Sequence, residues 1–250
     1  MFGPVSRRWS ESPRSGHLTD RARLAVVDAS QIADVLSHSP VFAPLGQRER
    51  LELAARMRSK HFQRNEVIFH RDDPAGHVYL IASGTVKVSV PEEGGQEVVI
   101  ALHRGGDVFG EISLFDEGPR SATVTAMTET TTFALANRDF MDVLRGSPDA
   151  MRQLLALLAT RIRRSTGHIE DLVFLDLPGR LAKLLLDQNE LLGSTNVIPL
   201  TQEDLAQFVG ATRVAVNRVL ADLERRGAVK LGRGQVDILD PVVLKKEIRY

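Results

Sequence analysis

The residues with the clearest chemistry lie in one block, from Phe109 to Val124, which reads Phe-Gly-Glu-Ile-Ser-Leu-Phe-Asp-Glu-Gly-Pro-Arg-Ser-Ala-Thr-Val. Gly110 followed by a short helical turn offers free backbone N–H groups to an anion. Arg120 can form paired hydrogen bonds with a phosphate, and the neighbouring Ser121 adds a short hydroxyl. Glu111 can accept hydrogen bonds from a sugar hydroxyl. Each residue alone also fits an ordinary turn or surface position, but the block as a whole predicts a specific anion site.

A second group of residues, near the C-terminus, has the spacing of a helix-turn-helix. Thr201 is a suitable N-cap for a first helix, and Gly210 permits the sharp turn after it because glycine takes positive φ without a Cβ penalty. Thr212 then caps a second helix. The apolar residues expected to pack the two helices together are Leu205, Ala206, Val209, Val216, Val219, Leu220 and Leu223.

The outward face of the second helix carries polar residues suited to DNA. Arg213, at the N-terminal end, can reach guanine O6 and N7, and its polar neighbours can hold phosphates. The alternative is the solvated face of an ordinary small helical domain. Two short apolar runs that flank a Gly-Arg-Gly turn at 232–234 predict a hairpin wing and favour DNA binding. The residues expected at the DNA interface are Thr201, Gln202, Thr212, Arg213, Val214, Asn217, Arg218 and Arg233.

Other elements must position these two groups. Helical stretches are expected at 30–36 and 47–57. Between Glu66 and about Phe133 the chain has short β-type runs at 67–69, 78–81, 86–90, 98–102 and 122–126, separated by glycines that include Gly94 and Gly95. Many short strands with regular turn signals predict a small antiparallel sandwich or roll.

A long helix is expected after Pro148, with apolar residues at alternating spacings of four and three. This heptad pattern is typical of two helices packed along each other, so we expect a homodimer. The alternative is that the apolar stripe packs on its own β-domain. Asp176 as N-cap and Pro178 in the first turn predict a new helix and a domain boundary. The expected interface residues are Met151, Leu155, Leu158, Ile162, Ile169 and Leu172, with Ser165 as a polar interruption.

Composition narrows the class of protein. The 250 residues carry no net charge, 43% are hydrophobic, and cysteine is absent. A disulfide framework and a cysteine-ligated iron–sulfur cluster are therefore excluded. No apolar run approaches the roughly 20 residues of a membrane helix, and no secretory signal pattern is present, so we expect a cytoplasmic location. Neutral charge does not exclude DNA binding, because charge placement can create a local positive face. No metal-ligand cluster or nucleophile–base pair is evident.

The block at 109–124, a long helix and a winged helix-turn-helix together resemble the cyclic-AMP receptor protein (CRP/FNR) family, over about Ser30 to Pro241. Residues 1–27 are rich in Pro, Ser, Gly and Arg without sustained periodicity, which predicts a flexible tail. The resemblance implies an α+β fold with a cyclic-nucleotide-binding antiparallel β-roll at 28–149, a dimerisation helix at 150–175 and a winged helix-turn-helix domain at 176–250. The block becomes a phosphate-binding cassette, with Gly110 and Glu111 at the ribose and Arg120 and Ser121 at the cyclic phosphate. The remaining ligand residues that it implies are Ile112, Ser113, Ser165 and Thr166, the last two contacting adenine.

The resemblance also implies a function: a homodimeric transcriptional regulator, not an enzyme, that binds a palindromic operator under the control of cyclic AMP. RNA polymerase is a further implied partner, and no metal is expected. Two alternatives stay open, a ligand-independent regulator with a vestigial pocket and a sensor of another nucleotide such as cyclic GMP. A cyclic-nucleotide-regulated enzyme is not expected, because the winged domain accounts for the residues after Asp176 and leaves none for a catalytic domain. One departure concerns DNA reading: where family recognition helices commonly read Arg-Glu-Thr-Val, this chain reads Arg-Val-Ala-Val at 213–216.

Overall fold

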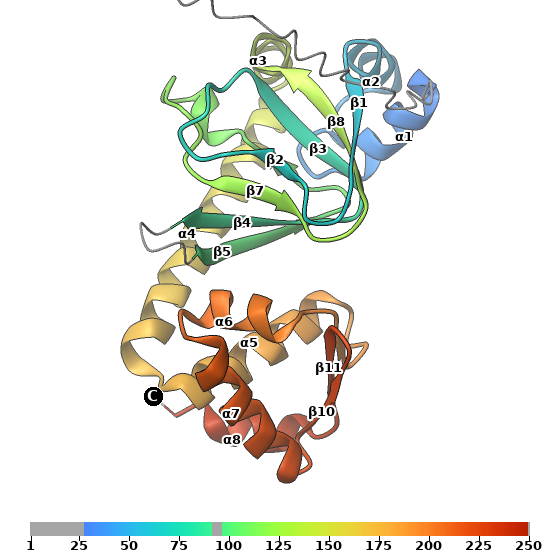
Figure 1. The fold of residues 1–250 in the computed structure, drawn as a ribbon. Coiled ribbons are helices and arrows are strands. Elements are labelled where there is room, and N and C mark those ends of the chain that lie inside the picture. The colour runs from blue at the N-terminus through green and yellow to red at the C-terminus, as the bar shows by residue number, and fades with distance from the viewer. Residues whose placement is uncertain (1–27, 92–96, 250) are drawn as a thin grey trace, which may run out of the picture.

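The computed structural model describes residues 28–91 and 97–249, so the expected tail at 1–27 and the Gly94–Gly95 turn lie outside the described residues. A β-domain and a smaller, mainly helical C-terminal domain are joined by the long helix α4 (Pro148–Phe174), as Figure 1 shows. In the described ranges, no helix has both the length and the apolar character that crossing a bilayer requires.

The β-domain is built from two antiparallel four-stranded sheets that face each other. The first has the strand order β1-β8-β3-β6 and the second β2-β7-β4-β5. All five expected strands are present, and the expectation of a small antiparallel roll is confirmed. The strand bounds are β1 Arg58–Phe62, β2 Val67–Phe69, β3 His77–Ser83, β4 Thr85–Pro91, β5 Glu97–Arg104, β6 Val108–Phe109, β7 Thr123–Ala126 and β8 Thr130–Ala136.

Strand alternation divides the apolar residues of the β-domain between two cores. Tyr79 and Ile81 of β3 point between the sheets, toward Val86 and Val124 of the facing sheet. The intervening residues of β3, such as Leu80, point the other way and pack under the helices. Those helices are α1 (Ala29–His38), α2 (Gln47–Ala54), α3 (Asn137–Gly146) and the first turns of α4. The helix predicted at 47–57 ends at Ala54 in the structure. Helix α3 was not predicted from the sequence.

The C-terminal domain has a core of its own. It begins with α5 (Leu177–Leu191), where Asp176 caps the helix by accepting a hydrogen bond from the Gly179 N–H, as expected. The helix-turn-helix consists of α6 (Gln202–Val209) and α7 (Arg213–Arg225). The wing strands β10 (Val229–Gly232) and β11 (Gln235–Ile238) pair as expected, and the unexpected strand β9 (Val197–Ile198) extends them into a three-stranded sheet. Helix α8 (Pro241–Glu247) closes the domain against α5.

The two domains touch through the outer face of the second β-sheet. Val99 of β5 is buried in the same apolar cluster as α6, and the Lys87 ammonium on β4 donates to the Gln207 side chain over 3.0 Å. Arg104, at the end of β5, donates to Leu191 O at the end of α5 over 2.9 Å and to the Gln188 side chain over 3.2 Å. The C-terminal domain is thus docked on one face of a sheet whose other face lines the interior of the roll.

Candidate functional site

Arg120 is a tightly enclosed charge in the roll, with 3% of its surface exposed. Its Nη1 donates to Gly110 O over 2.8 Å, and its Nη2 donates to His77 O over 2.7 Å. Its backbone pairs with the loop at Asp72 and Asp73, over 2.8 and 3.0 Å. Burial lowers the pKa of the guanidinium. The Nε–H group is buried and has no hydrogen-bond acceptor among the described residues, so one donor of this cation is unsatisfied there.

A cluster of three aromatic rings lies beside this arginine inside the roll. The Arg120 guanidinium carbon lies 4.2 Å from the centre of the Phe69 ring and 5.8 Å from that of Tyr79. Tyr79 stacks on Phe109 with ring centres 5.1 Å apart and an angle of 11° between the planes. The interior between the sheets is therefore apolar and aromatic around a fixed guanidinium.

Glu111 is almost completely buried, with 1% exposed, and it forms an ion pair that the sequence did not indicate. Its Oε1 accepts from Arg161 Nη1 of α4 over 2.5 Å, and Arg161 Nη2 donates to Val108 O. A buried carboxylate requires such a partner, because burying an unpaired charge is costly. Arg161 therefore ties the predicted cassette to the long helix across 50 residues of sequence.

His103 of β5 is a second functional candidate that sequence reasoning missed. It pairs with Val86, and directly paired residues of an antiparallel sheet point to the same face, so its side chain lies toward the roll interior. Burial, together with the charges of Arg161 and Arg164, lowers its pKa to about 3. These effects outweigh the Asp107 carboxylate, 3.9 Å from Nδ1. His103 is therefore a neutral imidazole at neutral pH.

The other predicted cassette residues occupy different environments. Gly110 has φ +78°, in the region that favours glycine, and a Cβ there would lie 2.6 Å from Arg120 Nη1. Ser113, in the 3₁₀ turn η1 (Ile112–Leu114), is buried and donates to Pro119 O over 3.0 Å, so its hydroxyl holds the cassette together. Ile112 is 48% exposed, and Ser121 is exposed as well.

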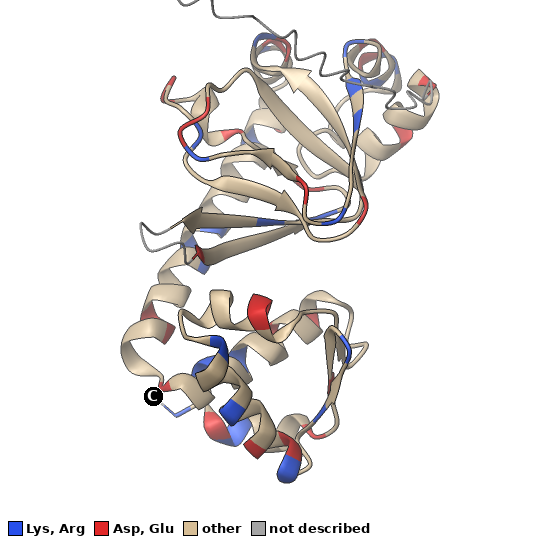
Figure 2. Cartoon of the chain, in the orientation of Figure 1, with Lys and Arg blue, Asp and Glu red and all other residues tan. Residues whose placement is uncertain are grey.

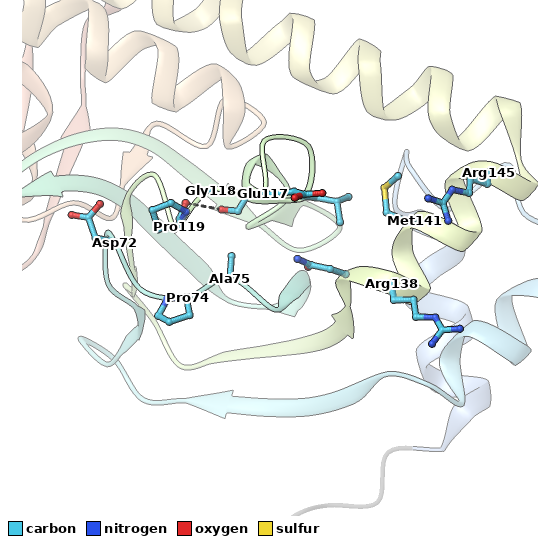
Figure 3. A pocket seen from close by; sticks show the side chains of 12 residues that line it. Asp72, Pro74, Ala75, Glu117, Gly118, Pro119, Arg138, Met141 and Arg145 are labelled. Atoms are coloured by element: carbon cyan, nitrogen blue, oxygen red, sulfur yellow. Dashed lines mark hydrogen bonds between the residues drawn. The ribbon is translucent and has the colours of Figure 1, made fainter.

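A hollow of about 620 Å³ lies on the outer side of the cassette. In Figure 3, Glu117, Gly118 and Pro119 of the cassette line it on one side, and Met141 and Arg145 of α3 line it on another. Of the predicted ligand residues it includes Ser113 alone, and Arg120 and Glu111 do not line it. The hollow is therefore separate from the group of charges inside the roll.

Helix α4 presents its predicted seam unevenly. Leu155, Ile162 and Ile169 are 57%, 68% and 60% exposed, whereas Met151 and Leu158 pack partly on the β-domain core. Leu172 is 41% exposed, and one of its methyl groups would lie 3.7 Å from a Cβ placed on Gly210 of the helix-turn-helix. The alternative of packing on the chain's own β-domain thus describes part of the stripe.

The two predicted adenine-contacting residues, Ser165 and Thr166, are both exposed on α4. Ser165 lies four residues after Arg161, and this spacing places the two on one helix face. The Thr166 hydroxyl donates to Ile162 O over 3.1 Å. Ser165 therefore lies one helical turn after Arg161, and both hydroxyl residues are exposed to solvent in a single chain.

The helix-turn-helix has the local structure that its sequence predicts. Thr201 and Asp204 form a capping box, and the Thr212 hydroxyl accepts from the Ala215 N–H over 3.3 Å. Gly210 ends α6 with φ +62°. The expected inner residues of both helices are buried or half-buried in the domain core.

The predicted DNA-contacting face is open to solvent. Arg213, Arg218 and the wing residue Arg233 are exposed, and Val214 is 71% exposed. Basic residues follow α7 and the wing in Figure 2. Asn217 differs from expectation: it is half-buried, and its Oδ1 is shielded from solvent without a partner among the described residues. Asn217 is therefore less accessible to solvent than Arg213 and Arg218.

A crevice of about 450 Å³ separates the helix-turn-helix from the wing. Thr201, Gln202 and Arg213 line one side, and Gly232 and Gly234 of the wing turn line the other. The crevice brings predicted DNA-contacting residues from separate segments onto one surface.

Comparison with known proteins relates both regions to one family. The family model described as "Cyclic nucleotide-binding domain" matches residues 59–147, and the one described as "Crp-like helix-turn-helix domain" matches residues 179–247. A CRP-like cAMP-activated global transcriptional regulator of Mycobacterium tuberculosis is 32% identical over 222 residues, which cover 86% of this chain and 99% of that relative. The cyclic AMP receptor protein of Thermus thermophilus is 34% identical over 83% of this chain and 96% of its own length.

Solved structures agree in fold. A CRP-family transcriptional regulator from Thermus thermophilus is similar with a TM-score of 0.65 and 27% identity, over 76% of this chain and 96% of that protein. A CRP/FNR-family structure from Eubacterium rectale reaches a TM-score of 0.70 at 22% identity, over 86% of this chain and all of that protein, and so supports the fold alone.

Proposed function

Because the chain belongs to the CRP/FNR family of DNA-binding transcriptional regulators, which are not enzymes, we propose that it is a homodimer whose affinity for DNA is controlled by cyclic AMP. The observation that carries the ligand part of the proposal is Arg120. It is a buried cation with an unsatisfied Nε donor inside the roll. A cyclic phosphate supplies the acceptor and the negative charge that the site lacks.

The other groups around the roll interior complement the rest of the nucleotide. Glu111 uses Oε1 for Arg161, which leaves Oε2 to accept from the ribose 2′-hydroxyl. Ser165 and Thr166 offer hydroxyls to the adenine edge from α4, either of the same chain or of its partner. Pairing of two α4 helices would bury the exposed stripe of Leu155, Ile162 and Ile169. Removing this apolar surface from water stabilises the dimer.

Control then follows as a shift between two arrangements of the helix pair. Nucleotide between the cassette and α4 acts on the Glu111–Arg161 link and favours one arrangement. The junction at Leu175–Asp176 transmits it to the DNA-binding domains. This sets the two α7 helices about 34 Å apart, the spacing of successive major grooves on a palindromic operator. Without nucleotide the dimer still binds DNA weakly through phosphate contacts. A regulator of this kind acts in the cytoplasm, where it can also contact RNA polymerase.

Calorimetric titration of the full-length protein with cyclic AMP and with cyclic GMP tests the ligand. We expect preferential binding of cyclic AMP, and an Arg120→Ala variant to bind at least about 100-fold more weakly, because a buried charge-assisted contact is lost. The matched control is Arg138→Ala, at an exposed arginine in the hollow outside the cassette. Unchanged affinity in Arg120→Ala contradicts the cassette assignment.

The same samples decide the remaining parts of the proposal. Operator affinity measured by fluorescence anisotropy is expected to rise about 10- to 100-fold with cyclic AMP, and sedimentation should give a dimer. Preference for cyclic GMP would identify a sensor of another nucleotide. Binding of neither nucleotide, with full operator affinity, would identify a ligand-independent regulator with a vestigial pocket.

A further inference from the structure

Phe69, the last residue of β2, lies beneath the Arg120 guanidinium inside the roll. The 4.2 Å between the guanidinium carbon and the ring centre is well within the range of a cation–π contact. Phe69 is itself fixed, because Tyr79 and Phe109 lie against it with ring centres 5.8 and 6.0 Å away. The strand register also fixes it, since Phe69 pairs with Val124 of β7.

The contacts of Arg120 leave one edge of the guanidinium open. Nη1 and Nη2 are each held by a backbone carbonyl, the Phe69 ring covers a face, and Nε remains without an acceptor among the described residues. An arginine side chain loses considerable rotamer freedom when it is fixed. Here that loss occurs on folding rather than on binding, and this preorganisation raises affinity for whatever occupies the open edge.

We infer that Phe69 is a positioning residue of the nucleotide site: its ring holds the Arg120 guanidinium so that the Nε edge meets the cyclic phosphate. The inference rests on the proposed function, because it takes the phosphate of a cyclic nucleotide as the occupant. Tyr79 is less suited to this role, since its ring centre is 5.8 Å from the guanidinium carbon. Phe109 stacks on Tyr79 and forms no cation–π contact with Arg120 among the described residues.

Three variants of the full-length protein test this role by calorimetry with cyclic AMP. Phe69→Leu removes the ring face and is expected to weaken binding about tenfold. Phe69→Tyr keeps the face and should bind within about twofold of the natural protein. The matched control is Phe140→Leu, which removes a buried ring of the other β-domain core, away from Arg120, and should stay within about twofold.

A second measurement separates positioning from general packing. The Arg120 Nε–H signal in ¹⁵N NMR, assigned by its absence in Arg120→Lys, should be rigid in the ligand-free natural protein and in Phe69→Tyr. In Phe69→Leu it should be mobile and exchange faster with water. Equal affinity, or equal Nε–H mobility, in Phe69→Leu and the natural protein overturns this inference alone. Failure of the natural protein to bind any cyclic nucleotide overturns the proposed function as well.

Discussion

Two arginines in this chain have opposite surroundings. Arg120 in the roll is 3% exposed, bonded to two carbonyls and covered by an aromatic ring. Arg213, at the start of α7, is exposed to solvent in a face that also holds Arg218. The first is fixed in the free protein, whereas the second is hydrated there.

This difference predicts how each region responds to change. A group in a dry, preorganised site contributes strongly, because little water screens it and little order has to be created on binding. Solvated arginines on DNA act through counterion release, so each contributes moderately and depends on salt. Substitutions in the roll should therefore produce larger and more local effects than substitutions on α7.

The largest effect is expected for Gly110→Ala. The new Cβ would lie 2.6 Å from Arg120 Nη1, at a backbone φ of +78° that alanine adopts only with strain. Arg120 must then leave its place, so we expect cyclic AMP affinity, measured by calorimetry, to fall by about 100-fold or more.

The control for Gly110→Ala is Gly193→Ala, in the C-terminal domain. Gly193 has a similar φ of +73°, but nothing among the described residues lies within 4 Å of its added Cβ. It should lose about 1 kcal/mol of unfolding free energy from backbone strain and retain its affinity for nucleotide. An equal loss of binding in both variants would mean that strain, and not the displacement of Arg120, is responsible.

A smaller effect should reveal how dry the roll interior is. Burial lowers the pKa of His103 to about 3, below its usual 6.5. The unfolded chain therefore binds more protons than the folded one between these values, and stability falls as pH falls through this window. From pH 7 to pH 4.5 the natural protein should lose about 2 kcal/mol more unfolding free energy than a His103→Leu variant.

Denaturant unfolding at the two pH values provides this measurement. The matched control is His70→Leu, at an exposed position, which should keep the pH dependence of the natural protein. If the His103→Leu variant keeps the pH dependence of the natural protein, water reaches the imidazole in the folded state. The roll interior would then not be dry, and its contrast with the solvated face of α7 would be wrong.

The sequence predicted the local features of both regions and missed the long-range contacts. The caps at Thr201 and Thr212, the turn at Gly210 and the inward residues of α6 and α7 follow from local propensity and spacing. Strand β8 was missed because its threonines at 130–132 are not a conspicuous apolar run, although two of them are fully buried.

The site itself shows the same limit. Arg120 and Glu111 were identified from one contiguous block, but their partners come from elsewhere in the chain. Arg161 looks like an ordinary polar position of a heptad helix, and Phe69 like an ordinary strand residue. The residues next to Arg161 and Phe69 in the sequence do not indicate which charged group of the cassette each one contacts. That contact depends on how α4 and β2 pack against the cassette in the folded chain. The dimer-interface and DNA-contacting residues stay predictions.

The smallest expected effect concerns Val214, the exposed apolar residue beside Arg213. A valine can offer only an apolar contact, for example to a thymine methyl, whereas glutamate accepts from cytosine N4. Val214→Glu should therefore move the preference at one base step of the half-site toward cytosine by about 1 kcal/mol, roughly fivefold, in a randomised-operator binding assay. The matched control is Val242→Glu, at a 60% exposed valine of α8, which adds the same charge to the domain and should leave the base profile unchanged. Identical profiles for the natural protein and Val214→Glu would remove Val214 from the reading surface and leave base recognition to the arginines alone.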